Sequence, residues 1–168
     1  ELIFENAKIP KSSLIGNEGD GFKVAMSGLD KGRLTIAAIA LGLGQRCLDE
    51  AMKYTLSRKQ FNKEIFDFQG LQFLISEMAI KLELARSTVE KTANLCDEGK
   101  PLGALSAIAK CAATDMAMSV STDAVQCLGG VGYTKEFPVE RFMRDAKVLQ
   151  IVEGTNQIQK VVIARQLK

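Results

Sequence analysis

The sequence contains no histidine. This absence excludes a Ser-His-Asp triad, a Cys-His dyad and any zinc site that is built on imidazole. Acid–base chemistry in this chain must therefore come from the side chains of Glu, Asp, Lys, Tyr or Cys. The restriction adds weight to each candidate carboxylate.

Several other features are also missing. No apolar run approaches the ~20 residues that a membrane-spanning helix needs, and the first residues lack the basic and apolar regions of a signal peptide. The net charge of +2 gives no reason to expect a nucleic-acid partner. The four cysteines form no C-x-x-C pair, so the simplest interpretation is a reduced, intracellular protein without a disulfide framework.

Most of the sequence has the periodicity of amphipathic helices. With 168 residues, of which 46% are hydrophobic, the chain is large enough for one domain with a real core. Apolar residues at three- and four-residue spacing predict helices over about 21–56, 68–97, 102–128, 138–146 and 155–166. Short links between them indicate an all-α fold, an antiparallel four-helix-type bundle. Residues 57–67 are predicted to form a charged connector, and tight helix packing is expected at Gly42 and Gly44.

The N-terminal segment differs from the rest. Residues 2–4 are predicted to form a short strand, and Pro10 and the glycines up to Gly21 keep the next residues irregular. Because a strand this short cannot form a sheet by itself, we expect the chain to be a fragment of a longer protein.

Glu153 is the candidate base. It follows an apolar run over residues 148–152, so we expect it to emerge from buried surroundings, which make a carboxylate a stronger base. Gly154 leaves room for a ligand near the backbone. Thr155 is a candidate N-cap of the last helix, and helix N-termini attract phosphates. Taken alone, a surface glutamate followed by an ordinary N-cap is the commoner explanation.

Three further motifs are individually weak. Residues 30–33 (Asp-Lys-Gly-Arg) place an acid and a base one helical turn apart, where a surface ion pair is the plain alternative. Arg58 and Phe61 combine a guanidinium with an aromatic ring, which suits a pyrophosphate and a ring system, although a solvated loop has the same composition. Residues 126–130 end a helix with two glycines, as a simple C-cap would.

The order of these motifs is more specific than any one of them. Together with F-Q-G-L-Q and P-V-E-R-F-M-R-D-A-K, the series that ends in I-V-E-G-T-N-Q-I-Q resembles the acyl-CoA dehydrogenase family over essentially the whole chain. The resemblance implies that residues 19–168 are the C-terminal helical bundle domain. It implies that residues 1–18 are the end of the middle β-domain and a linker, and that the earlier domains are absent.

The resemblance also implies the chemistry. Members of this family use FAD to oxidise an acyl-CoA thioester to the trans-2-enoyl-CoA. In most members the base is the glutamate that matches Glu153, and in a minority it stands at the position of Gly32. Since this chain has glycine at 32, the resemblance assigns the base to Glu153, whose own N–H is expected to polarise the thioester carbonyl together with the cofactor.

Further roles follow from the same resemblance. Positions that match substrate contacts are Asp30, Lys31, Gly32, Arg33 and Gly154. Positions that match contacts to the FAD of a neighbouring subunit are Arg58, Gln69, Gln126, Cys127, Leu128, Gly129 and Gly130. Positions that match contacts to the FAD of the same subunit are Thr155, Asn156 and Gln157.

The implied partners are an acyl-CoA substrate and an electron-transfer flavoprotein as acceptor. The implied assembly is a homotetramer, a dimer of dimers, located in the cytoplasm if bacterial and in the mitochondrial matrix if eukaryotic. The overall pattern leans toward short-chain, butyryl-CoA-type members. The sequence also departs from the family pattern. Asn62 replaces a usual glycine in the loop after Arg58. Val152 replaces a frequent tyrosine in the pocket wall, which leaves chain-length preference open. Alternatives are an acyl-CoA oxidase-type relative, or a bundle that in isolation only supports oligomerisation and binds FAD poorly.

Overall fold

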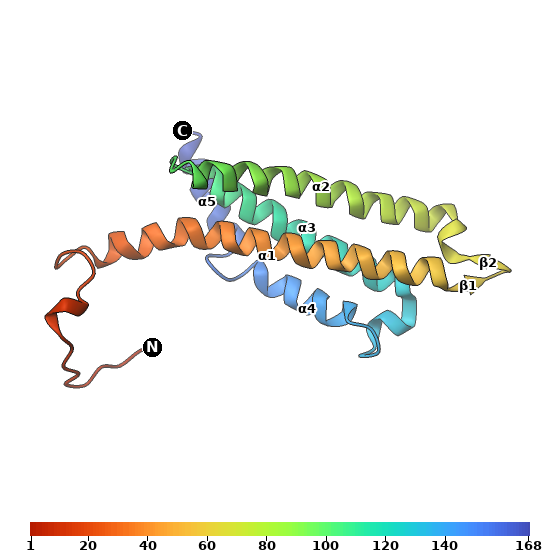
Figure 1. The fold of residues 1–168 in the computed structure, drawn as a ribbon, viewed down its shortest axis with the longest axis horizontal. Helices are drawn as coiled ribbons and strands as arrows, with labels where there is room; N and C mark the ends of the chain where they lie inside the picture. Colours follow the sequence, from red (N-terminus) through yellow and green to blue (C-terminus); the bar gives the residue numbers. More distant parts are fainter.

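Three long helices run side by side along most of the molecule (Figure 1). A computed structural model describes residues 1–168. The helices are α1 (Gly21–Ser57), α2 (Gln69–Asp97), α3 (Ala104–Leu128), α4 (Val139–Leu149) and α5 (Asn156–Gln166). The first four alternate in direction along the chain (Figure 1). The predicted all-α antiparallel bundle is therefore confirmed.

Helix α3 is the centre of the bundle. It contacts α1, α2, α4 and α5, and its many alanines let those neighbours approach closely. On the α1 side, a Cβ atom added to Gly44 would lie 2.6 Å from Met116 Sδ, which confirms the tight packing expected there. The same expectation for Gly42 is wrong, because Gly42 meets open space. Two residues along a helix turn the backbone by about 200°, so the two glycines face opposite ways.

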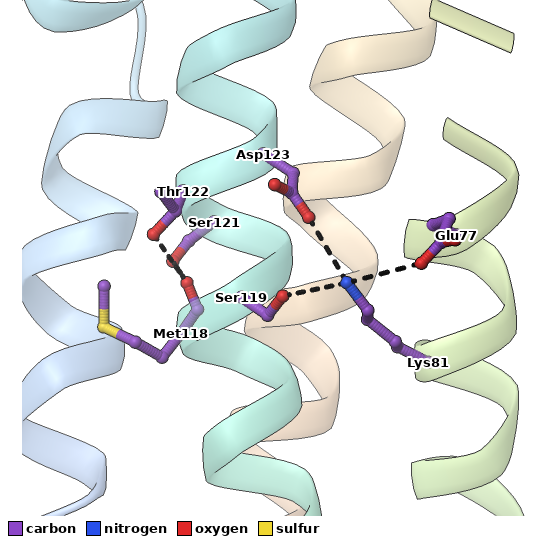
Figure 2. Close-up of polar contacts among 7 residues, drawn as sticks. All are labelled: Glu77, Lys81, Met118, Ser119, Ser121, Thr122 and Asp123. Atoms are coloured by element: carbon purple, nitrogen blue, oxygen red, sulfur yellow. Dashed lines mark hydrogen bonds and ion pairs between the residues drawn. The ribbon is translucent and has the colours of Figure 1, made fainter. Parts of the chain in front are cut away.

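Helix α2 packs its predicted apolar stripe against α3. Ile75, Met78 and Leu82 are buried in the core. Lys81 lies at the edge of this stripe and links the two helices (Figure 2). Its Nζ donates to Ser119 Oγ at 3.1 Å and lies 3.7 Å from an Asp123 carboxylate oxygen and 3.8 Å from Glu77.

The connector after α1 contains a small hairpin that the sequence did not predict. Strand β1 (Lys59–Gln60) pairs antiparallel with β2 (Lys63–Glu64). The two turn residues have positive φ, 52° at Phe61 and 63° at Asn62. Asparagine tolerates this left-handed region better than most side chains, so Asn62 suits the turn. Two 3-10 turns, η2 (Ile65–Asp67) and η3 (Gly129–Tyr133), lead into α2 and follow α3.

The N-terminal segment does not form the predicted strand. Residues 1–20 contain only the 3-10 turn η1 (Lys11–Ser13) and extend away from the bundle (Figure 1). A strand exists only when a neighbour accepts its backbone hydrogen bonds, and the hairpin strands pair with each other. None of the helices is both long and apolar enough to cross a membrane.

Candidate functional site

The loop between α4 and α5 carries Glu153 in an unusual backbone conformation. Glu153 has φ 54° and Gly154 has φ 89°. A non-glycine residue in such a left-handed conformation costs on the order of 1–3 kcal/mol, and it persists only where the surrounding structure fixes it. Thr155 then caps α5 as predicted, because its Oγ1 accepts the Ile158 N–H at 3.3 Å.

Two buried side chains, Lys110 and Gln159, bind the backbone carbonyls of this loop from inside the bundle. The Gly154 carbonyl accepts from Lys110 Nζ at 3.0 Å and from Gln159 Nε2 at 3.1 Å. Gln159 Nε2 also donates to the Glu153 carbonyl at 3.0 Å. The N–H groups of Glu153, Gly154 and Thr155 have no acceptor within the chain. Both carbonyls are thus occupied, while three consecutive N–H groups are free to bind an oxygen atom of a ligand.

Asn156 joins the same network from the start of α5. Its Oδ1 accepts from Lys110 Nζ at 2.8 Å, and its Nδ2 donates to Asp115 Oδ1 at 2.7 Å and to Thr114 Oγ1 at 2.9 Å. Burial lowers the pKa of Lys110, and Cys111 and Asp115 partly oppose that shift. The Asn156 side chain is thus engaged inside the protein, and its predicted flavin contact stays a prediction.

Sequence reasoning missed Lys110, Asp115 and Gln159. A signal was present for Lys110, since a lysine in the middle of an alanine-rich helix that is predicted to be central must find partners when buried. Gln159 and Asp115 gave no such signal, because only the packing of α5 on α3 brings them to the loop.

Of the predicted substrate-binding residues 30–33, Gly32 lies against Glu153. A Cβ atom added to Gly32 would lie 2.6 Å from Glu153 Oε2, so the glutamate carboxylate lies against that glycine. Next to it, Arg33 Nη1 and Asp30 Oδ1 form an ion pair at 2.8 Å, as the plain alternative predicted. Arg33 Nε is buried without a partner, and Lys31 is exposed.

The surroundings of Glu153 are more open than predicted. Glu153 is exposed, and Ile151 and Val152 remain 52% and 37% accessible. Helix α4 buries Ala146 and Leu149 on its inner face, and the chain then turns outward. The expectation that the run before Glu153 is buried is therefore wrong, except at Leu149.

A second group of predicted residues lines a groove beside the hairpin. The groove has a volume of about 500 Å³. Its lining includes the predicted residues Arg58, Gln126, Cys127, Leu128, Gly129 and Gly130. Gln69, the first residue of α2, is exposed and does not line it.

The composition of the groove suits a dinucleotide. Arg58 offers a guanidinium for a pyrophosphate, Gln126 offers an amide, and Tyr54, Ile65 and Leu71 offer an apolar wall. Burial raises the pKa of the Cys127 thiol to about 11, so this cysteine is a packing residue at neutral pH. The residues present fit a flavin adenine dinucleotide.

The groove and the Glu153 loop occupy different ends of the same helix. Lys110 stands beneath the loop and Gln126 at the groove, and sixteen residues of α3 separate them by about 24 Å. Figure 1 shows the hairpin at one end of the bundle and the α4–α5 loop toward the other. The predicted residues of one chain therefore lie in two separate groups, one at the groove and one at the Glu153 loop.

Comparison with known proteins gives a consistent result. The family profile described as "Acyl-CoA dehydrogenase, C-terminal domain" matches residues 19–168. A probable acyl-CoA dehydrogenase of Mycobacterium tuberculosis is 55% identical over 168 residues, which is 99% of this chain and 43% of that protein. The butyryl-CoA dehydrogenase structure from Megasphaera elsdenii is 46% identical with a TM-score of 0.96, and the match covers 98% of this chain and 43% of that one.

A solved structure from work on the electron transferring flavoprotein of Acidaminococcus fermentans is also similar. It is 52% identical with a TM-score of 0.96, and the match covers 98% of this chain and 43% of that chain. The chain thus spans less than half the length of the relatives that it matches.

Proposed function

The chain belongs to the acyl-CoA dehydrogenase family, of which it carries the C-terminal domain, and we propose that it supplies the catalytic base for the FAD-dependent α,β-dehydrogenation of an acyl-CoA. The observation that carries this proposal is the placement of Glu153. Its carboxylate lies against Gly32, and its own N–H and those of Gly154 and Thr155 have no acceptor within the chain. A base and an oxyanion-binding group are thereby adjacent.

In this proposal the Glu153 carboxylate removes the α-proton of the acyl-CoA. That proton becomes acidic only if the negative charge that develops on the thioester oxygen is stabilised. The N–H of Glu153 is a free donor next to the base, and Gly154 has no side chain that would obstruct the approach of the thioester. Asp30, Lys31 and Arg33 lie on the adjacent turn of α1 and are proposed to contact the CoA portion.

We propose flavin contacts both at the groove and at the Glu153 loop. Arg58, Gln126 and residues 129–130 would hold one FAD, and Thr155 with Gln157 would contact another. When bound, FAD supplies the two-electron acceptor for the hydride that leaves the β-carbon. Lys110, beneath the loop, and Gln126, at the groove, stand about 24 Å apart along α3, and this separation favours contacts of the two groups to two different flavins. We therefore propose a homotetramer in which neighbouring chains complete each other's sites.

We propose a short-chain acyl-CoA as the substrate and an electron-transfer flavoprotein as the acceptor. Similarity to a butyryl-CoA dehydrogenase supports the first, and the match to a structure from work on an electron transferring flavoprotein supports the second. An oxidase would instead pass the electrons to oxygen, so peroxide formation under air by the complete protein would contradict the proposed acceptor.

The role of Glu153 can be tested with the Glu153→Gln variant of the complete protein. Loss of a positioned general base lowers the rate by about 10²–10⁴-fold, so turnover of butyryl-CoA should fall by that factor while butyryl-CoA still binds. Glu90→Gln is a matched control, because Glu90 is an exposed glutamate on α2 and should leave turnover unchanged. Normal turnover by Glu153→Gln would contradict the proposal.

A further inference from the structure

We propose that Lys110 is a positioning residue that fixes the Glu153 loop from inside the bundle. Its ammonium holds the carbonyl of Gly154 inward, and the amide of Asn156 connects it to the carboxylate of Asp115. This inference rests on the proposed function of Glu153 as the base, and it assigns to a buried lysine the task of keeping that base in place.

The first support is the burial of Lys110. Its side chain is fully buried and is the largest side chain in the structure that is. Buried lysines are rare, because a charged group removed from water needs compensating partners. No carboxylate oxygen lies within ion-pair distance of this ammonium. Its partners are the Gly154 carbonyl at 3.0 Å and the Asn156 Oδ1 at 2.8 Å.

The second support is the way in which the neutral amide of Asn156 links the ammonium of Lys110 to the carboxylate of Asp115. Its amide oxygen faces the Lys110 ammonium, and its amide nitrogen donates to Asp115 Oδ1 at 2.7 Å. A cation at one end of an amide and an anion at the other polarise it in the same direction, which strengthens both hydrogen bonds. Gln150 Nε2 donates to the same Asp115 oxygen at 2.6 Å. The network therefore binds both ends of the loop, Gln150 at its beginning and Asn156 at its end.

The third support is the strained backbone that the network holds. Glu153 has φ 54°, and the donors to its own and the next carbonyl are Gln159 and Lys110. With these carbonyls turned inward, the N–H groups of residues 153–155 remain free. Removal of the charged donor would let the peptide of Gly154 rotate. The Glu153 carboxylate would then leave its place against Gly32, and the free N–H groups would change direction.

Lys110→Met in the complete protein tests this role, because methionine keeps most of the length and removes all donors. A displacement of a reacting group by about 1 Å costs on the order of 100-fold in rate, so we expect kcat for butyryl-CoA to fall by about that factor while the Kd for butyryl-CoA stays within threefold. Lys110→Gln retains an uncharged NH₂ donor group and should lose less activity. It serves as the test variant if Lys110→Met fails to fold. Met78→Ala, a core truncation on α2, controls for general destabilisation.

Amide hydrogen exchange measures the protection of the loop N–H groups independently of activity. In the wild type the N–H groups of Ile151 and Val152 donate to the Val148 carbonyl, and that of Asn156 donates to the Gln150 carbonyl. These three N–H groups should exchange at least tenfold faster in Lys110→Met. Their exchange rates should be unchanged in Met78→Ala. Unchanged exchange there, or a kcat loss no larger than that of Met78→Ala, would overturn the positioning role. Absence of dehydrogenation in the wild type would instead refute the proposed function, and the exchange result would still decide the role of Lys110 in holding the loop.

Discussion

The carboxylate of Glu153 lies against Gly32, so closely that a Cβ atom on Gly32 would be 2.6 Å from Oε2 of Glu153. The two residues belong to different elements, α1 and the loop after α4. The resemblance to the family implies a base at one or the other of these positions, and the structure brings both to the same point. A glycine at 32 is therefore what gives the glutamate at 153 its space.

Gly32→Ala should displace the base without weakening the fold. The added methyl group forces the carboxylate away from α1, and a shift of about 1 Å lowers a rate on the order of 100-fold. Alanine in a helix interior is favourable by up to about 1 kcal/mol relative to glycine, so Tm should not fall. Steady-state kinetics of the complete protein check this. Gly28→Ala is the control, because open space surrounds Gly28 on the same helix; equal activity of the two variants would show that the contact has no effect on the base.

Lys81→Met should loosen the contact between α2 and α3. The variant removes the hydrogen bond to Ser119 and leaves Asp123 without its cation (Figure 2). Because Lys81 is partly exposed, water screens these interactions, and we expect a loss of roughly 0.5–1 kcal/mol. Chemical denaturation at low and high salt measures it, with the exposed Lys91→Met on the same helix as the control. An unchanged midpoint would mean that Lys81 contributes nothing to the packing of α2.

Stability should decrease at alkaline pH because of two buried thiols. Burial raises the pKa of Cys47 to about 12 and that of Cys127 to about 11, from 9.0. Between pH 9 and these values the native state binds more protons than the unfolded state, so the free energy of unfolding falls as pH rises. Below pH 9 both states are protonated and these two thiols give no slope. Denaturation midpoints at pH 8 and pH 10.5 test this, and Cys47→Ala should flatten the decrease; an equal slope in the variant would contradict the assignment.

The helices could be predicted because their signal is local. The spacing of apolar residues indicated α2 over 68–97 and α5 over 155–166, and the structure has Gln69–Asp97 and Asn156–Gln166. The strand over residues 2–4 was wrong because a strand needs a partner, and periodicity contains no information about one. The β1–β2 hairpin was missed for the opposite reason, since its strands are too short for alternation to be visible.

The site was predictable only as a set of separate motifs. Residue order marked Glu153, Arg58 and Gln126 as candidates, and the family profile confirms only the family from which their roles are inferred. The resemblance grouped Arg58 with Gln126, but residue order did not reveal the groove that the two side chains line, because that depends on which ends of α1 and α3 meet. Nor did it reveal Lys110, whose partners lie 44 and 46 residues away in the chain.

We propose that the base is a carboxylate at the point where residues 32 and 153 meet. The most direct measurement is the rate of flavin reduction by butyryl-CoA in the complete protein, compared among the wild type, Glu153→Gly and the double variant Gly32→Glu/Glu153→Gly. Glu153→Gly should lose about 10²–10⁴-fold in this rate, and the double variant should recover at least a tenfold part of that loss, because its carboxylate enters the same space from α1. A Glu153→Gly variant that reduces the flavin at the wild-type rate would show that this carboxylate is not the base.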